Sequence, residues 1–220
     1  MRTIKVTGKG NLKVKPDMTR VTMTLEGVYP EYEETLQKST QDTECLKEVL
    51  GKLGFAKSDL KTLSFNVDTK QENYRDKHNE WKQRFVGYEF HHIMKLEFDS
   101  DNALLGKVLF ALANAPVRPE FRLSYTVKDK EKTKNELLGK AVADAKEKAE
   151  VLAQAAGVTL NSLINIDYSW NELDIEVRPM NRAVFAARCA TSAKEESYDM
   201  DIEPDDIDIS DTVTIVWEIV

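Results

Sequence analysis

Hydrophobic residues follow two different spacings along this chain, and the two spacings alternate. Where every second residue is apolar, the pattern predicts half-buried strands; where apolar residues recur three and four apart, it predicts amphipathic helices. We expect helices over residues 31–53, 101–112 and 130–156, the second of them capped by Ser100. We expect strands over residues 4–14, 21–28, 60–69, 86–98, 117–127, 163–170 and 207–219.

The third helix has the clearest pattern. Its apolar residues form one stripe, and charged residues occupy the other side. Gly157 is placed to end it in the left-handed conformation. Small side chains on the stripe allow a close approach, so we interpret this segment as a helix that packs tightly on a sheet. The stripe consists of Leu138, Ala141, Val142, Ala145, Ala149, Leu152 and Ala156.

Two glycines interrupt the apolar face of the first strand. Gly8 and Gly10 stand where the alternation calls for large residues, which indicates a bulge or a close approach of another backbone. The short turn at Pro16-Asp17 follows, and we expect it to join strands 4–14 and 21–28 as a hairpin.

The order of elements predicts an α+β fold. A strand–helix–strand unit occurs at 21–69 and again at 117–170, and the flanking strands of each unit can lie parallel through a crossover. Apolar alternation on one face only places the helices on one side of a mixed, largely antiparallel sheet, in two layers. We expect one domain over residues 1–220, with possible pseudo-repeat halves 1–99 and 100–220 and an irregular loop at 171–206.

Composition narrows the function. The 31 basic and 38 acidic residues give a net charge of −7, which argues against a general nucleic-acid binder. No apolar run is long enough to cross a bilayer, and no signal peptide is visible. As written, we expect a cytoplasmic protein; a leader removed beforehand would make it periplasmic or envelope-bound. For Cys45 and Cys189 we expect two free thiols, with a disulfide as the alternative.

No motif points to a reaction. His91 and His92 are neighbours on a strand, so they face opposite sides and cannot share a metal; we expect His92 to be a hydrogen-bonded core residue. The acidic run from Asp199 to Asp205 fails the calcium-loop pattern. Residues 71–84 are polar and aromatic, as in an exposed loop or hairpin tip. We therefore expect no catalytic residues, no cofactor, no metal and no identifiable small-molecule ligand.

Two groups of residues are candidates for binding or assembly. Lys5, Lys9 and Lys13 share one face of the first strand, and Tyr74 and Trp81 could stack on bases, so an anionic partner is one hypothesis, although we do not expect nucleic acid itself. The alternative is a solvated face, or one covered by a second subunit. The middle of the irregular loop is basic and apolar, through Arg178, Met180, Arg182, Phe185 and Arg188.

Four stretches together resemble one known family. They are IKVTGKGNLKVKPDMTRVTMTLEG at the start, LGFAKSDLKTLSFNV, VGYEFHHIMKLEF, and AVADAKEKAEVLAQAAGVTLNSLINI with the closing DIDISDTVTIVWEIV. Their order and spacing are similar to the SIMPL domain family, whose bacterial members include a periplasmic oxidative-stress-defence protein and an outer-membrane antigen. The chain departs from the family pattern at Asp205 and Asp211, and the export signal that many members carry is not visible in the sequence as written.

The resemblance implies an α+β domain, an association with oxidative-stress tolerance, and assembly into ring- or channel-like oligomers. It implies no catalytic residue or cofactor. Our leading hypothesis is a non-enzymatic, self-associating homo-oligomer that acts indirectly in stress defence. The alternative is a module that binds an anionic partner, nucleic acid or an acidic surface, through the lysine face of the first strand.

Overall fold

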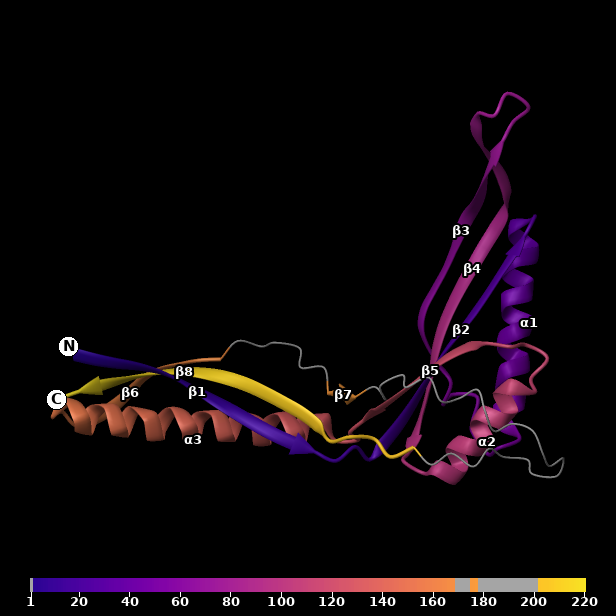
Figure 1. The fold of residues 1–220 in the computed structure, drawn as a ribbon. Coiled ribbons are helices and arrows are strands. Elements are labelled where there is room, and N and C mark those ends of the chain that lie inside the picture. The colour runs from indigo at the N-terminus through magenta and orange to yellow at the C-terminus, as the bar shows by residue number, and fades with distance from the viewer. Residues whose placement is uncertain (1, 169–174, 178–201) are drawn as a thin grey trace. The chain divides into compact units, whose positions relative to one another are not determined.

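Two compact units make up the chain, and each is described by itself. The computed structural model describes residues 2–168, 175–177 and 202–220 (Figure 1). Unit 1 contains Met1–Asp17, Thr126–Val177 and Pro204–Val220, and unit 2 contains Met18–Tyr125 and Arg178–Glu203. The units are therefore not sequential halves. The single domain and the pseudo-repeat division at 1–99 and 100–220 stay predictions.

Unit 1 is a three-stranded antiparallel sheet with one long helix. Strand β1 (Arg2–Val14) pairs with β8 (Ile207–Ile219), and β8 pairs with β6 (Leu160–Asp167), so β8 is central. Helix α3 (Lys130–Ala156) packs mainly along β1 and β8, and Figure 1 shows it running beside them. A two-residue strand, β7 (Glu176–Val177), falls in the chain segment of unit 1 but is not part of this sheet, because its neighbour is β5 (Glu120–Thr126).

Unit 2 is a second sheet with helices on one face. Strands β3 (Lys61–Arg75), β4 (Trp81–Asp99), β2 (Met18–Tyr29) and β5 (Glu120–Thr126) are neighbours in that order. Helices α1 (Tyr32–Gly51) and α2 (Asn102–Ala113) share one hydrophobic core with the inward residues of β2 and β4. Both units are two-layered, so the expected α+β class is confirmed.

The same connection appears in both units. In each sheet, the chain order is a strand, a helix and two further strands, and the last strand lies between the first two. In unit 2 these elements are consecutive, β2–α1–β3–β4, whereas in unit 1 they are β1, α3, β6 and β8, with other elements between β1 and α3 and β7 between β6 and β8. Since β2 and β3 both run antiparallel to β4, they are parallel to each other, as expected for 21–69. The expectation for 117–170 was wrong in one respect, because the strand that β6 parallels across β8 is β1 and not β5.

The expected hairpin at Pro16-Asp17 is also wrong, because β1 and β2 lie in different sheets. Asp17 is held by the segment before α3: its backbone N–H donates to the Thr126 carbonyl at 3.2 Å, and its carboxylate accepts from the Lys128 N–H at 2.7 Å. These bonds fix the end of β1 beside the start of α3. The backbone of β1 forms its strand pairing with β8 and not with β2.

The glycine pair confirms the expected close approach of another backbone. A Cβ on Gly8 would collide with the carbonyl oxygen of Ala141 and would lie 2.6 Å from the Cβ of Ala145. A Cβ on Gly10 would collide with the carbonyl oxygen of Leu137. The bare faces of β1 and α3 therefore fit together only because both carry minimal side chains where they meet.

Helix α3 has the expected bounds, but its buried stripe differs from the expected one. The expectation placed Leu152 and Ala156 on the buried face, and both are exposed. The helix follows the twist of the sheet, so its contact line repeats every fourth residue. The buried residues are Thr133, Leu137, Ala141, Ala145, Ala149 and Ala153.

Helix α2 begins one residue later than expected. Its N-cap is Asp101, whose carboxylate accepts from the N–H groups of Ala103 at 2.8 Å and Leu104 at 3.2 Å. Ser100 is therefore not the cap; its hydroxyl lies 3.3 Å from that of Thr19 instead. The Asp101 carboxylate stands two and three residues before these N–H groups and satisfies both donors at once, which a single hydroxyl at Ser100 does not.

Candidate functional site

The three lysines of β1 lie together, as predicted. Lys5, Lys9 and Lys13 are exposed and point away from α3 on the outer face of unit 1. Their partners across the ladder are residues of β8, and Lys13 forms an ion pair with Asp208 at 3.5 Å. Both side chains of that pair are about 70 % exposed (73 % and 70 %), so solvent screens it and it contributes little to stability.

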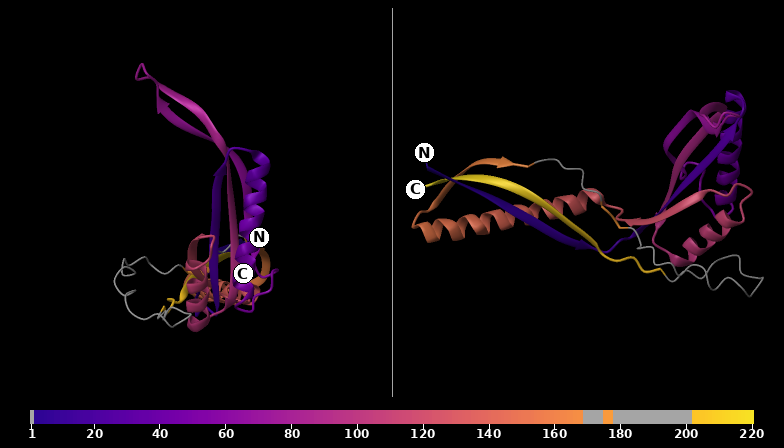
Figure 2. Two further views of the ribbon diagram at one scale, coloured as in Figure 1. Left: turned by 90° about the vertical axis from the view of Figure 1, so that its right-hand side faces the viewer. Right: turned by 45° about the horizontal axis from the view of Figure 1, so that its top comes forward.

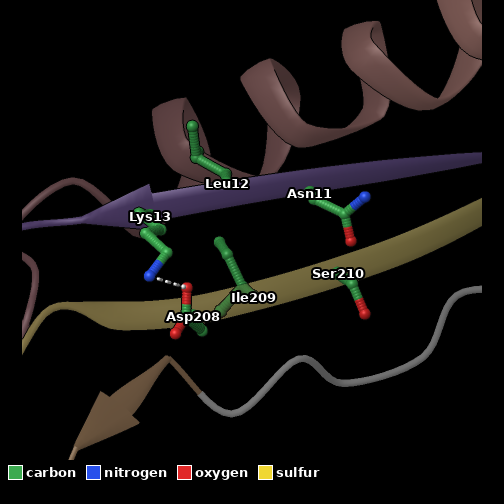
Figure 3. A pocket seen from close by; sticks show the side chains of 6 residues that line it. All are labelled: Asn11, Leu12, Lys13, Asp208, Ile209 and Ser210. Carbon is green, nitrogen blue, oxygen red and sulfur yellow. Dashed lines mark ion pairs between the residues drawn. The ribbon is translucent and has the colours of Figure 1, made fainter.

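A shallow pocket of about 370 Å³ lies at this end of the β1–β8 ladder (Figure 3). Figure 3 shows Lys13 pointing toward Asp208, with Asn11 and Ser210 further along the two strands. The pocket offers an open ion pair and two neutral polar groups, and no acid–base pair shielded from water. It lacks the convergent, desolvated groups that general acid–base chemistry requires. Its lining residues are Asn11, Leu12, Lys13, Asp208, Ile209 and Ser210.

Tyr74 and Trp81 lie in unit 2, on a two-stranded arm. Residues 71–84 form the end of the β3–β4 hairpin, as expected for an exposed hairpin tip, and Figure 2 shows this hairpin continuing past the end of α1. The Arg75 guanidinium lies 4.8 Å from the Trp81 ring centre, and that of Arg84 lies 5.9 Å from Tyr74. Arginines of the arm thus already stack on both rings, and the lysines of β1 belong to the other unit.

The two histidines face opposite sides of β4, as predicted. His92 is only 8 % exposed, and its ring nitrogens lie 3.1 Å from the Thr43 hydroxyl and 2.8 Å from the Thr62 hydroxyl. Burial, together with the charge of Lys47, lowers the pKa of His92 and favours the neutral ring. His92 is therefore a hydrogen-bonded core residue, as expected.

His91 lies on the outer face between two carboxylates. Its ring nitrogens are 3.6 Å from Glu26 and 3.7 Å from Glu89. Across the described part of the chain, no group of three or more His, Cys, Asp or Glu side chains is placed to hold a metal ion.

The two edges of the unit 1 sheet differ. At β1, the N–H of Lys9 donates to the Asp144 carboxylate of α3 at 2.6 Å, so the helix covers part of this edge. At β6, no helix side chain plays this part among the hydrogen bonds of the described residues, and three apolar side chains are exposed: Leu163 (51 %), Ile164 (40 %) and Ile166 (47 %). Leu163 and Ile164 are consecutive along β6, so they point to opposite faces of the sheet. β6 is therefore an edge strand with exposed apolar side chains on both faces.

Unit 2 ends in a similar strand. β3 is the edge of its sheet, and Leu63 (54 %) and Phe65 (45 %) are exposed on it. Both β3 and β6 follow the helix of their unit, and both show a register shift beside the corresponding leucine, Leu63 or Leu163. Sequence reasoning did not single out these strands as sites. For β6 the available signal was apolar residues on both faces, in LINI, where a covered strand would alternate. The LSF stretch of β3 alternates and carries no such signal.

The remaining candidates from the loop lie outside the described residues. These are Arg178, Met180, Arg182, Phe185 and Arg188, and Cys189 lies there as well. Cys45, on α1, is a half-buried free thiol. None of the helices in the described ranges is both long and apolar enough to cross a membrane.

Comparison with known proteins identifies the same family that the order of the motifs resembles. No curated protein matches the chain. The family model SIMPL, described as a protein of unknown function (DUF541), matches residues 4–217. The match begins in β1 and ends in β8, so it spans the described elements of both units. The chain belongs to the SIMPL family.

Proposed function

We propose that this chain is a non-enzymatic SIMPL-family protein that assembles with copies of itself and contributes indirectly to stress defence. The observation that carries the self-association is the pair of apolar edge strands, β3 and β6. The stress-defence part rests on the resemblance to the family. The cytoplasmic location stays a prediction.

Exposed apolar edge strands favour association for a simple reason. An edge strand presents unpaired N–H and C=O groups, and proteins that stay monomeric usually protect such edges with charge, proline or a covering element. Here the exposed side chains at Leu163, Ile164 and Ile166 are apolar, so pairing with another strand would satisfy backbone groups and remove apolar surface from water together.

The absence of enzymatic activity is supported by the chemistry of the described residues. The buried histidine already has two threonine partners, and the pocket beside Lys13 is open to solvent. A measurable turnover that is lost on substituting either His92 or Asp208 would contradict this part of the proposal.

Sedimentation velocity of the full chain from about 1 to 100 µM tests self-association, since transient interfaces have dissociation constants in this range. We expect species larger than the 25.1 kDa monomer that grow with concentration. A single monomeric species throughout would overturn the proposal. Survival of cells lacking the gene after peroxide treatment, with and without the restored gene, tests stress defence.

A second candidate function is binding of an anionic partner through the outer face of β1. It is favoured by three exposed lysines on one face, Lys5, Lys9 and Lys13, and weakened by Asp208 on the neighbouring strand. The test is binding of a fluorescent polyanion such as heparin by the chain and by a triple Lys→Glu variant, over a salt titration. An affinity for heparin that depends neither on salt concentration nor on the three substitutions would contradict this candidate function.

A further inference from the structure

We propose that the self-association is head to tail, with β3 of one copy adding antiparallel to β6 of the next copy. This inference rests on the proposed self-association and identifies the two strands that carry it. Each chain would then offer one β3 edge and one β6 edge, so every copy contacts two others. Such heterologous contacts close into a ring when the rotation between copies allows it.

β6 is the accessible edge of the unit 1 sheet. The opposite edge, β1, is partly occupied from within the chain, because Asp144 accepts the Lys9 N–H. The Lys148 ammonium lies 2.7 Å from the same carboxylate and lowers its pKa, together with the Lys9 N–H. A charged, anchored carboxylate at β1 disfavours a new strand there, whereas β6 carries apolar side chains.

Charge distinguishes the possible pairs of strands. β6 carries one charge, Asp167, at its end, and the first seven residues of β3 carry Lys61 at their start and no acidic residue. Antiparallel pairing brings the start of one strand beside the end of the other, so Lys61 would lie near Asp167. Pairing β6 with another β6 would bring no opposite charges together, and neither would pairing this part of β3 with itself.

The apolar side chains of the two strands also match. Leu63 and Phe65 on β3 and Leu163 on β6 are each about half-exposed. In the antiparallel register that places Lys61 opposite Asp167, Phe65 would lie opposite Leu163, and Leu63 would lie beside this pair on the extended sheet. Cross-strand apolar pairs of this kind are the unit by which sheets are stabilised.

The test is sedimentation velocity of the full chain and of surface variants, each checked by circular dichroism. We expect Leu63→Lys and Leu163→Lys each to weaken association by at least about ten-fold, since each puts a charge where apolar side chains would meet. Leu152→Lys is the matched control: Leu152 is an equally exposed leucine on α3, away from both edges, and its substitution should leave association unchanged.

Charge reversal separates the head-to-tail pair from the alternatives. Lys61→Asp and Asp167→Lys should each weaken association by about five-fold, and the double variant should regain it. An equimolar mixture of the two single variants should also regain it, because each then meets an opposite charge. If neither single reversal matters and Leu163→Lys does, then β6 pairs with itself and the head-to-tail arrangement is overturned.

Two further outcomes separate this inference from the proposed function. A parent chain that assembles, with Leu63→Lys and Leu163→Lys both without effect, overturns the strand assignment and leaves self-association standing. A parent chain that is monomeric throughout overturns both.

Discussion

Gly8 of β1 lies against the backbone of Ala141 in α3, so closely that a Cβ at position 8 would collide with the Ala141 carbonyl oxygen. Strand and helix here meet backbone to backbone. The contact also brings the Lys9 N–H to Asp144, one turn further along the helix. One small residue in the strand therefore decides both how close the helix lies and how the β1 edge is covered.

Gly8→Ala should destabilise unit 1. The added methyl group meets backbone that cannot move aside cheaply, and overpacking of this kind costs about 1–3 kcal/mol or more. Urea unfolding measures the change. Gly139→Ala is the matched control: this glycine lies inside α3 with open space around its Cβ position, so alanine should stabilise the helix by up to about 1 kcal/mol. Equal effects at the two positions would contradict the close contact.

Asp101→Ala should shorten or loosen the start of α2. The carboxylate satisfies two N–H groups, and loss of an N-cap costs about 0.5–2 kcal/mol. Ser100→Ala is the control, and we expect it to have the smaller effect because Ser100 contacts only Thr19 among these groups. The urea unfolding midpoints of the two variants measure the effect. A larger loss of stability in Ser100→Ala than in Asp101→Ala would show that Ser100 is the N-cap.

Stability should fall as the pH drops below about 6.5, the pKa of an unperturbed histidine. Burial lowers the folded-state pKa of His92, so the unfolded chain binds a proton at higher pH than the folded one does. The stabilisation by neutral His92 is therefore complete above the unfolded pKa and is lost as the pH falls toward the folded pKa. Urea midpoints between pH 8 and pH 5 measure it.

The control for this pH dependence is a histidine that is exposed. His92→Asn should flatten the dependence between pH 8 and pH 5, even though it lowers the absolute stability. His78→Asn, on the exposed turn between β3 and β4, should leave the dependence unchanged. If His78→Asn flattens the curve and His92→Asn does not, burial of His92 is not its cause.

Lys57→Met should raise the pKa of Glu44. Side-chain hydrogen bonds from Lys47 and Lys57 lower the pKa of this carboxyl to about 2, and the Lys57 ammonium is 2.8 Å away. Since the folded pKa is depressed, the contribution of Glu44 is present above its unfolded pKa and declines as the pH falls toward 2. Carboxyl carbon chemical shifts during an NMR titration measure the pKa. Lys52→Met, in the same region, should leave it unchanged.

Local spacing was sufficient for the elements and for part of their packing. The bounds of α3 and the close approach at Gly8 and Gly10 follow from residue size and periodicity, which depend on neighbours in the sequence. The core position of His92 also follows from alternation on β4. Two local expectations differed from the structure. Leu152 is exposed because the helix follows the twist of the sheet, and Ser100 is not the N-cap because the Asp101 carboxylate takes that place.

Local spacing in the sequence did not determine which strands pair. Alternation in β1 specifies which face is buried and says nothing about which strand lies beside it, so the expected hairpin with β2 was replaced by a ladder with β8, some 200 residues away. The candidate edges at β3 and β6 depend on the same non-local choice. A strand becomes an edge only when the sheet stops there, and only the tertiary structure decides where α3 leaves Leu163 and Ile166 uncovered.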